Sequence, residues 1–86
     1  MASYRLELET RALKELKGLP KDRRVLLSGV LDDLERDPRP PGAKKLSGVD
    51  GWRVRKGDCR VLYTVDDPSR LVRVYRIGHR REVYRR

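Results

Sequence analysis

The chain has 86 residues, with 22 lysines and arginines against 13 aspartates and glutamates, giving a net charge of +9 and a pI of about 10.3. This length fits one small domain with a thin core, which we place at residues 1–86. No apolar run exceeds three residues, which excludes a membrane-spanning helix and a secretory signal, so we expect a cytoplasmic protein with no membrane partner. Cys59 and His79 are too few for a disulfide or a zinc site, and we expect no metal and no cofactor.

Positive charge is concentrated in the second half of the chain. Residues 1–40 contain nine basic and eight acidic side chains, whereas residues 41–86 contain thirteen and five. Like charges crowded on a small fold repel one another, so a polyanionic partner explains this asymmetry well. A merely solvated surface is the alternative interpretation.

The first half predicts one strand and two helices. Residues 4–9 alternate apolar and charged side chains, which is typical of a half-buried strand. Thr10 then caps a predicted helix that ends at Gly18. Pro20 suits the first turn of a second helix, which ends before Pro38.

The second half predicts a loop and three strands. Residues 38–51 are rich in proline and glycine without periodicity, so we expect a loop there, with Lys44 and Lys45 on it. Three strand-like runs follow, separated by turn sequences: Trp52–Lys56, Cys59–Asp66 and residues 71–78. This order predicts an α+β domain in which a helical hairpin packs on one face of a small, mostly antiparallel sheet.

Gly57 and Asp58 form a predicted two-residue hairpin turn. Counting outward from the turn pairs Arg55 with Arg60 and divides the hairpin into two faces. The face expected to meet the helices carries Trp52, Val54, Val61, Tyr63 and Val65. The other carries Arg53, Arg55, Arg60 and Leu62. Like charges directly opposite each other cost up to about 1 kcal/mol, so we interpret the arginines as a phosphate-binding surface, with solvated spacers as the alternative.

The C-terminal residues hold further candidates. They include a basic cluster: Arg76, Arg80, Arg81, Arg85 and Arg86. His79 and Tyr84 are each consistent with packing or with proton transfer. The sequence has no glycine-rich phosphate loop, no Ser/His/Asp set and no second histidine, which disfavours conventional hydrolase chemistry. Cleavage of RNA by its own 2′-hydroxyl remains open.

Two segments resemble the RelE branch of the RelE/ParE toxin superfamily. They are GWRVRKGDCRVLY at residues 51–63 and YRIGHRREVY at residues 75–84, and the likeness extends over essentially the whole chain. The resemblance implies a RelE-like fold and a toxin of a toxin–antitoxin pair that cleaves mRNA in the ribosomal A site by 2′-hydroxyl attack. The implied activity is that of a metal-independent endoribonuclease. The implied partners are the ribosome, mRNA and an acidic, RelB-like antitoxin.

The resemblance also assigns roles by position. It implies that the catalytic residues are Arg60, Arg80 and Tyr84. The RNA-binding residues would be Arg53, Arg55, Lys56, Lys44, Lys45 and Arg81. The best-known RelE pattern has lysines at positions 53 and 55, and arginine does not release its proton readily, so an electrostatic role is expected there. Tyr84, Lys56, His79, or a substrate or ribosomal group remain for proton transfer.

Two other functions stay open at this point. A ParE-like inhibitor of DNA gyrase would use the same fold without cutting RNA. A non-catalytic RNA- or ribosome-binding module would need only the density of lysine and arginine.

Overall fold

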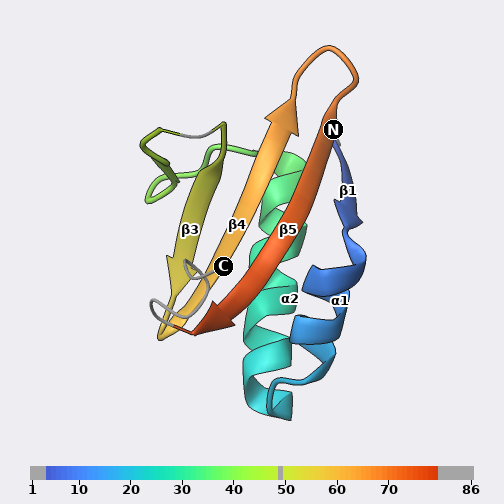
Figure 1. Ribbon diagram of the computed structural model, residues 1–86, viewed down its shortest axis with the longest axis vertical. Helices are drawn as coiled ribbons and strands as arrows, with labels where there is room; N and C mark the ends of the chain where they lie inside the picture. The colour runs from blue at the N-terminus through green and yellow to red at the C-terminus, as the bar shows by residue number, and fades with distance from the viewer. Residues whose placement is uncertain (1–3, 49, 80–86) are drawn as a thin grey trace.

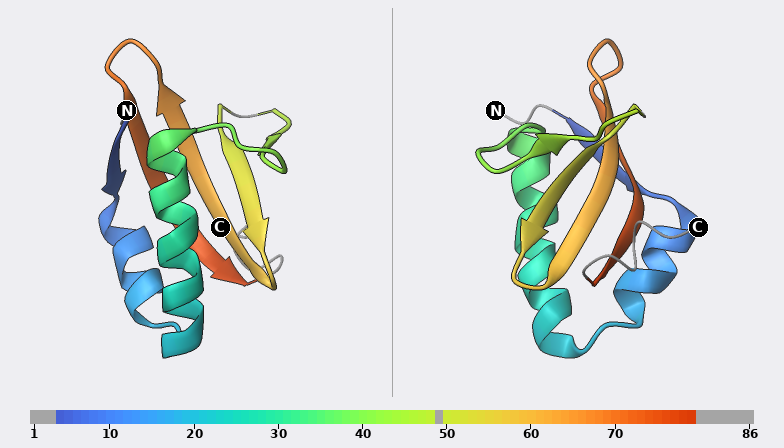
Figure 2. Two further views of the ribbon diagram at one scale, coloured as in Figure 1. Left: turned by 180° about the vertical axis from the view of Figure 1, so that it is seen from behind. Right: turned by 60° about the vertical axis from the view of Figure 1, so that its left-hand side comes forward.

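The computed structural model describes residues 4–48 and 50–79. The elements follow in the order β1 (Arg5–Leu8), α1 (Thr10–Lys17), α2 (Lys21–Arg36), β2 (Lys44–Lys45), β3 (Trp52–Lys56), β4 (Cys59–Asp66) and β5 (Leu71–His79). The strands form one sheet in the order β1-β5-β4-β3-β2. Figure 1 shows α2 behind this sheet and α1 beside the lower half of β5, and Figure 2 shows the same layers from behind and from the side. The expected α+β architecture is confirmed.

The β3–β4 hairpin has the predicted register. Arg55 pairs with Arg60, Val54 with Val61, and Trp52 with Tyr63. The β4–β5 pairing is also antiparallel, whereas β1 pairs with β5 in parallel, so the sheet is mixed. The central hairpin thus presents its two faces as the alternation of its side chains requires.

Two local expectations were wrong. Lys44–Lys45 form the short strand β2 within the predicted loop, and the Leu46 N–H donates to the Gly51 carbonyl at 2.9 Å beside it. A two-residue strand is too short to produce a recognisable alternation. Thr10 is the first helical residue rather than the cap, because the Leu13 N–H donates to the Glu9 carbonyl at 2.9 Å.

The core lies between the sheet and the helices. Its sheet side consists of side chains that are less than 2% exposed: Val61, Tyr63, Val72, Val74, Ile77 and Cys59. From the helices, Ala12, Leu27 and Leu34 pack against them at 0–1% exposure. Trp52 and Val65 pack at the margin, as expected for that face. No helix among the described residues is long and apolar enough to cross a membrane.

A set of polar contacts ties the N-terminal residues to the β4–β5 turn. The Tyr4 hydroxyl donates to Asp67 Oδ1 at 2.6 Å, and Arg39 donates to both Asp67 oxygens at 3.2 and 2.9 Å. The hydrogen bonds from Arg39 and then from Tyr4 lower the pKa of Asp67. This carboxylate therefore stabilises the fold above its unfolded-state pKa, and the contribution is lost as the pH falls through the folded-state value.

Tyr63 contributes a buried polar contact within the core. Its side chain is 0% exposed, and its hydroxyl donates to the Pro38 carbonyl at 2.6 Å. Burial raises the pKa of Tyr63 to about 12. The phenol therefore remains a neutral hydrogen-bond donor and fixes the segment that follows α2 against the sheet.

Replacing Tyr63 by phenylalanine should destabilise the fold by about 1–3 kcal/mol, because the buried Pro38 carbonyl loses its donor. Urea unfolding followed by circular dichroism measures this change. The matched control is Tyr4→Phe. This variant removes an exposed hydrogen bond to Asp67, so its loss of stability should be smaller. Equal losses in the two variants would contradict the structural role given to the Tyr63 hydroxyl.

Candidate nucleic-acid interface

The helix-free side of the sheet carries two rows of residues across neighbouring strands. The first row runs from β2 to β5 and consists of Lys44, Arg53, Leu62 and Arg76. The second runs from β3 to β5 and consists of Arg55, Arg60 and Gly78. We call Lys44, Arg53, Arg55, Arg60 and Arg76 the basic face. In Figure 1 the side that carries it points toward the viewer, opposite α2.

The sequence-predicted arginines of this face differ in exposure. Arg55 is exposed, whereas Arg53 and Arg60 are half-buried and the Nε atom of Arg60 is buried. Leu62 lies between Arg53 and Arg76 and is only 4% exposed, although it is on the side away from the helices. An apolar side chain among guanidinium groups lowers the local dielectric, which strengthens their attraction for a phosphate.

The three lysines predicted to bind RNA occupy different positions on the sheet. Lys44 pairs with Arg53 and joins the basic face. Lys45 pairs with Trp52 instead, and its Nζ lies 5.6 Å from the centre of the indole ring, while Arg39 lies 5.3 Å from the same ring. Lys56 pairs with Cys59 at the end of the hairpin, one residue out of phase with the basic face. Of these three, Lys44 alone extends the arginine rows.

The remaining predicted site residues fall largely beyond the described part. Arg80, Arg81 and Tyr84 lie outside the described residues. For His79, β5 fixes the backbone opposite Cys59, and the side chain lies outside what the structure describes.

Glu15 of α1 reaches the basic face from the edge of the sheet. Its Oε2 accepts from Arg76 Nε at 3.0 Å, and its Oε1 accepts from the Ile77 backbone N–H at 2.8 Å. Arg76 and Glu15 are 12% and 24% exposed in this pair. β1 pairs with β5 only as far as Val74, so Glu15 supplies the acceptor for a strand edge that β1 does not cover. No local sequence pattern predicts this contact, because the partners are 61 and 62 residues apart.

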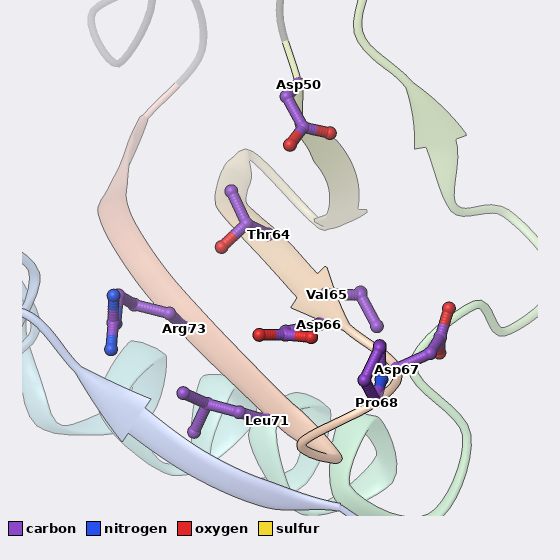
Figure 3. Close-up of a pocket in the computed structure, with 8 residues that line it drawn as sticks. All are labelled: Asp50, Thr64, Val65, Asp66, Asp67, Pro68, Leu71 and Arg73. Carbon is purple, nitrogen blue, oxygen red and sulfur yellow. The ribbon is translucent and has the colours of Figure 1, made fainter.

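The other end of the helix-free side is acidic. An open pocket of about 480 Å³ lies there, lined in part by Asp50, Thr64, Asp66 and Arg73. Figure 3 shows the Asp66 side chain between Thr64, Leu71 and Arg73. Across the described residues 4–48 and 50–79, no group of three His, Cys, Asp or Glu side chains could hold a metal ion. The helix-free side of the sheet therefore has an acidic end and a basic end, and the basic end is suited to phosphates.

The chain is similar to several known proteins. Residues 6–84 match a family model described as the ParE toxin of a type II toxin–antitoxin system, parDE. The chain is 34% identical to the toxin RelG of Mycobacterium tuberculosis, over 96% of this chain and 98% of that protein. The isolated RelE toxin of E. coli superposes with a TM-score of 0.80 at 31% identity, covering 96% of this chain and 92% of that one.

A third relative was solved with its partner. The toxin–antitoxin complex RelBE2 of Mycobacterium tuberculosis contains a chain with a TM-score of 0.81 and 28% identity, covering 91% of this chain and 99% of that one. The fold and the matches define a toxin of a type II toxin–antitoxin system. The chain belongs to the RelE branch of the RelE/ParE superfamily.

Replacing Glu15 by alanine should destabilise the fold by about 1–3 kcal/mol, because the Ile77 N–H loses its acceptor and Arg76 loses this ion pair. Amide hydrogen exchange should show faster exchange at Ile77 in particular. Glu15→Gln keeps an acceptor oxygen, so its stability should lie between those of the wild type and Glu15→Ala. The control is Glu7→Ala, whose ion pair with Arg73 is about half exposed and contributes at most about 1 kcal/mol. An unchanged Ile77 exchange rate in Glu15→Ala would contradict this role.

Proposed function

We propose that this toxin is a metal-independent, ribosome-dependent endoribonuclease that cleaves mRNA in the A site and so inhibits translation. The observation that carries the proposal is the pair of rows on the basic face. Along β3, Arg53 and Arg55 are two residues apart, which corresponds to about 7 Å. This spacing is comparable with that of successive phosphates in a nucleic-acid strand, so the two guanidinium groups suit neighbouring phosphates.

The reaction we propose needs no protein nucleophile. The 2′-oxygen of the RNA attacks the adjacent phosphorus and gives its proton to a base, while the bond from phosphorus to the 5′-oxygen breaks. The leaving 5′-oxygen takes up a proton, so the products are a 2′,3′-cyclic phosphate and a 5′-hydroxyl. Fixed positive charge beside the phosphorus stabilises the developing negative charge, which is the role we give to Arg60 and Arg80.

The other site residues receive supporting roles. Arg53 and Arg55 hold the mRNA backbone, together with Lys44 and the more peripheral Lys45, Lys56 and Arg81. Tyr84 positions or activates the 2′-hydroxyl, and His79 is a second candidate for proton transfer. Such a toxin acts where ribosomes translate, in the cytoplasm.

A cognate acidic antitoxin is the proposed protein partner. The relative of known structure named above was solved as a toxin–antitoxin complex. The net charge of +9 favours an acidic partner, whose binding should weaken with salt and retain an apolar component.

Gyrase inhibition is the second candidate, because the matching family model is that of ParE toxins. The individual relatives favour the nuclease, since the proteins at 31% and 34% identity carry RelE and RelG names. A supercoiling assay with purified gyrase and primer extension on translated mRNA separate the two. Binding without cleavage would leave the third reading, an RNA- or ribosome-binding module.

Primer extension on a defined mRNA in a purified translating system should show cuts confined to the A-site codon. Arg60→Ala should lower the cleavage rate about 100-fold or more, because a preorganised charge at the phosphorus is lost. The matched control is Arg36→Ala, on α2 and 68% exposed, which should cleave at the wild-type rate. Intact mRNA with the wild-type protein would overturn the proposed function.

Tyr84→Phe tests the proton-transfer assignment separately. The hydroxyl is removed and the ring is kept, so the single-turnover rate should fall at least about tenfold while ribosome binding is retained. Quench-flow measurement on programmed ribosomes gives the rate. A full rate in Tyr84→Phe would remove this role from Tyr84 and leave His79 or a ribosomal group.

A further inference from the structure

A β-bulge changes which side of the sheet one aromatic residue occupies. Tyr63 pairs with Val74, whereas the preceding residue Leu62 pairs with Arg76, so Tyr75 is the extra residue of the bulged strand β5. Val74 and Ile77 both face the core, at 0% and 1% exposure. Two residues therefore separate consecutive core positions, and both Tyr75 and Arg76 are directed to the helix-free side. Bulges of this kind re-aim side chains and are frequent next to functional sites.

The position of the Tyr75 hydroxyl shows how the side chain lies. It is 2.9 Å from the point that a Cβ atom on Gly51 would occupy, and a Leu46 methyl is 3.4 Å from the same point. Gly51 directly precedes β3, while Tyr75 is on β5, with β4 between these two strands. The phenol ring therefore extends across β4 on the helix-free side, and the lack of a side chain at Gly51 leaves room for its hydroxyl end.

The surroundings of this ring are those of a nucleic-acid site. Tyr75 is half-buried and lies two residues after Arg73 on β5, and Arg76 of the basic face is its neighbour in sequence. Tyr63 and Trp52 face the helices, so within residues 4–48 and 50–79 Tyr75 is the aromatic side chain that shares a side with the arginine rows. It lies between these rows and the pocket that contains Thr64 and Arg73.

Proteins bind single-stranded RNA with cations that hold its phosphates and with aromatic rings that stack on its unpaired bases. The basic face supplies the cations, and Tyr75 supplies a ring that extends from β5 to the backbone at Gly51. We propose that Tyr75 is a substrate-contacting residue that stacks on one base of the bound RNA, adjacent to the phosphates held by the arginine rows. This inference rests on the proposed function in taking RNA as the ligand.

A base-deletion experiment tests the stacking directly. Single-turnover cleavage is measured on programmed ribosomes with mRNAs in which each A-site nucleotide in turn is abasic but keeps its 2′-hydroxyl. At one position, loss of the base should slow the wild-type toxin about 10- to 100-fold. Tyr75→Leu should be slowed by a similar factor on the intact codon and should lose nothing more when that base is removed. Losses that simply multiply, or no loss in Tyr75→Leu, would overturn the proposal.

Two variants distinguish contact from a merely structural role. Tyr4→Leu makes the same substitution at a tyrosine that hydrogen-bonds Asp67 away from the basic face, and it should respond to the abasic position as the wild type does. Gly51→Ala places a methyl group against the Tyr75 hydroxyl and displaces the ring, so it should reduce the effect of the abasic position without changing Tyr75 itself.

Photo-crosslinking keeps the inference testable if the protein proves not to cleave mRNA. A short single-stranded RNA containing 4-thiouridine is irradiated with the wild-type toxin, and the adduct is mapped by mass spectrometry. A crosslink at Tyr75 in a toxin that leaves ribosome-bound mRNA intact would support the stacking contact and reject the nuclease. Cleavage of ribosome-bound mRNA by the wild type, with crosslinks only at other residues, would reject the stacking contact and leave the nuclease intact.

Discussion

Charge repulsion within the β3–β4 hairpin is the constraint on which the rest of the structure depends. Arg55 and Arg60 are direct partners in the ladder, and like charges in that arrangement cost up to about 1 kcal/mol. The opposite side of the same hairpin offsets this cost, because Val54, Val61 and Tyr63 are 9%, 1% and 0% exposed. Burying one such side chain contributes about 1.5–3 kcal/mol. The core thus holds the arginines at a fixed spacing that they would not adopt by themselves.

The edge of β5 shows how closely the fold and the basic face are connected. β1 covers this strand only from Leu71 to Val74, and α1 then provides Glu15 to complete the hydrogen bonding at Ile77. The same carboxylate pairs with Arg76, so one acidic side chain both completes the sheet and offsets positive charge on its helix-free side. The Arg76 side chain is only 12% exposed, so it lies beneath the surface of the basic face and offers little area to a ligand.

The sequence predicted what depends on short-range pattern. The two-residue turn at Gly57 and Asp58 determined the hairpin register, and alternation then placed Arg53, Arg55 and Arg60 on one side of the sheet. Strand β2 was missed because two residues carry no periodicity. The contacts of Glu15 and the bulge at Tyr75 were missed for a different reason. Both depend on which strands become neighbours, and a bulge shifts the alternation without any change in composition.

Of the predicted catalytic set, Arg60 lies in the sheet, and Arg80 and Tyr84 lie outside the described residues. Arg53 and Arg60 were recognisable from the sequence, but their half-buried setting near Leu62 was not. Burial of a side chain on the side away from the helices depends on the neighbouring strands, and the hairpin pattern alone contains no information about them.

The arginines at positions 53 and 55 also restrict how the proposed reaction obtains its base. A guanidinium keeps its charge at any physiological pH, so these residues stabilise charge and do not accept the proton of the 2′-hydroxyl. The phenols of Tyr63 and Tyr4 are unsuitable too, since burial raises the pKa of Tyr63 to about 12 and the hydrogen bond to Asp67 raises that of Tyr4. Lys56 is out of phase with the basic face. In the proposed reaction, the basic face is therefore better suited to binding and polarising a phosphate than to accepting a proton. This is expected if the C-terminal residues or the ribosome supply the base.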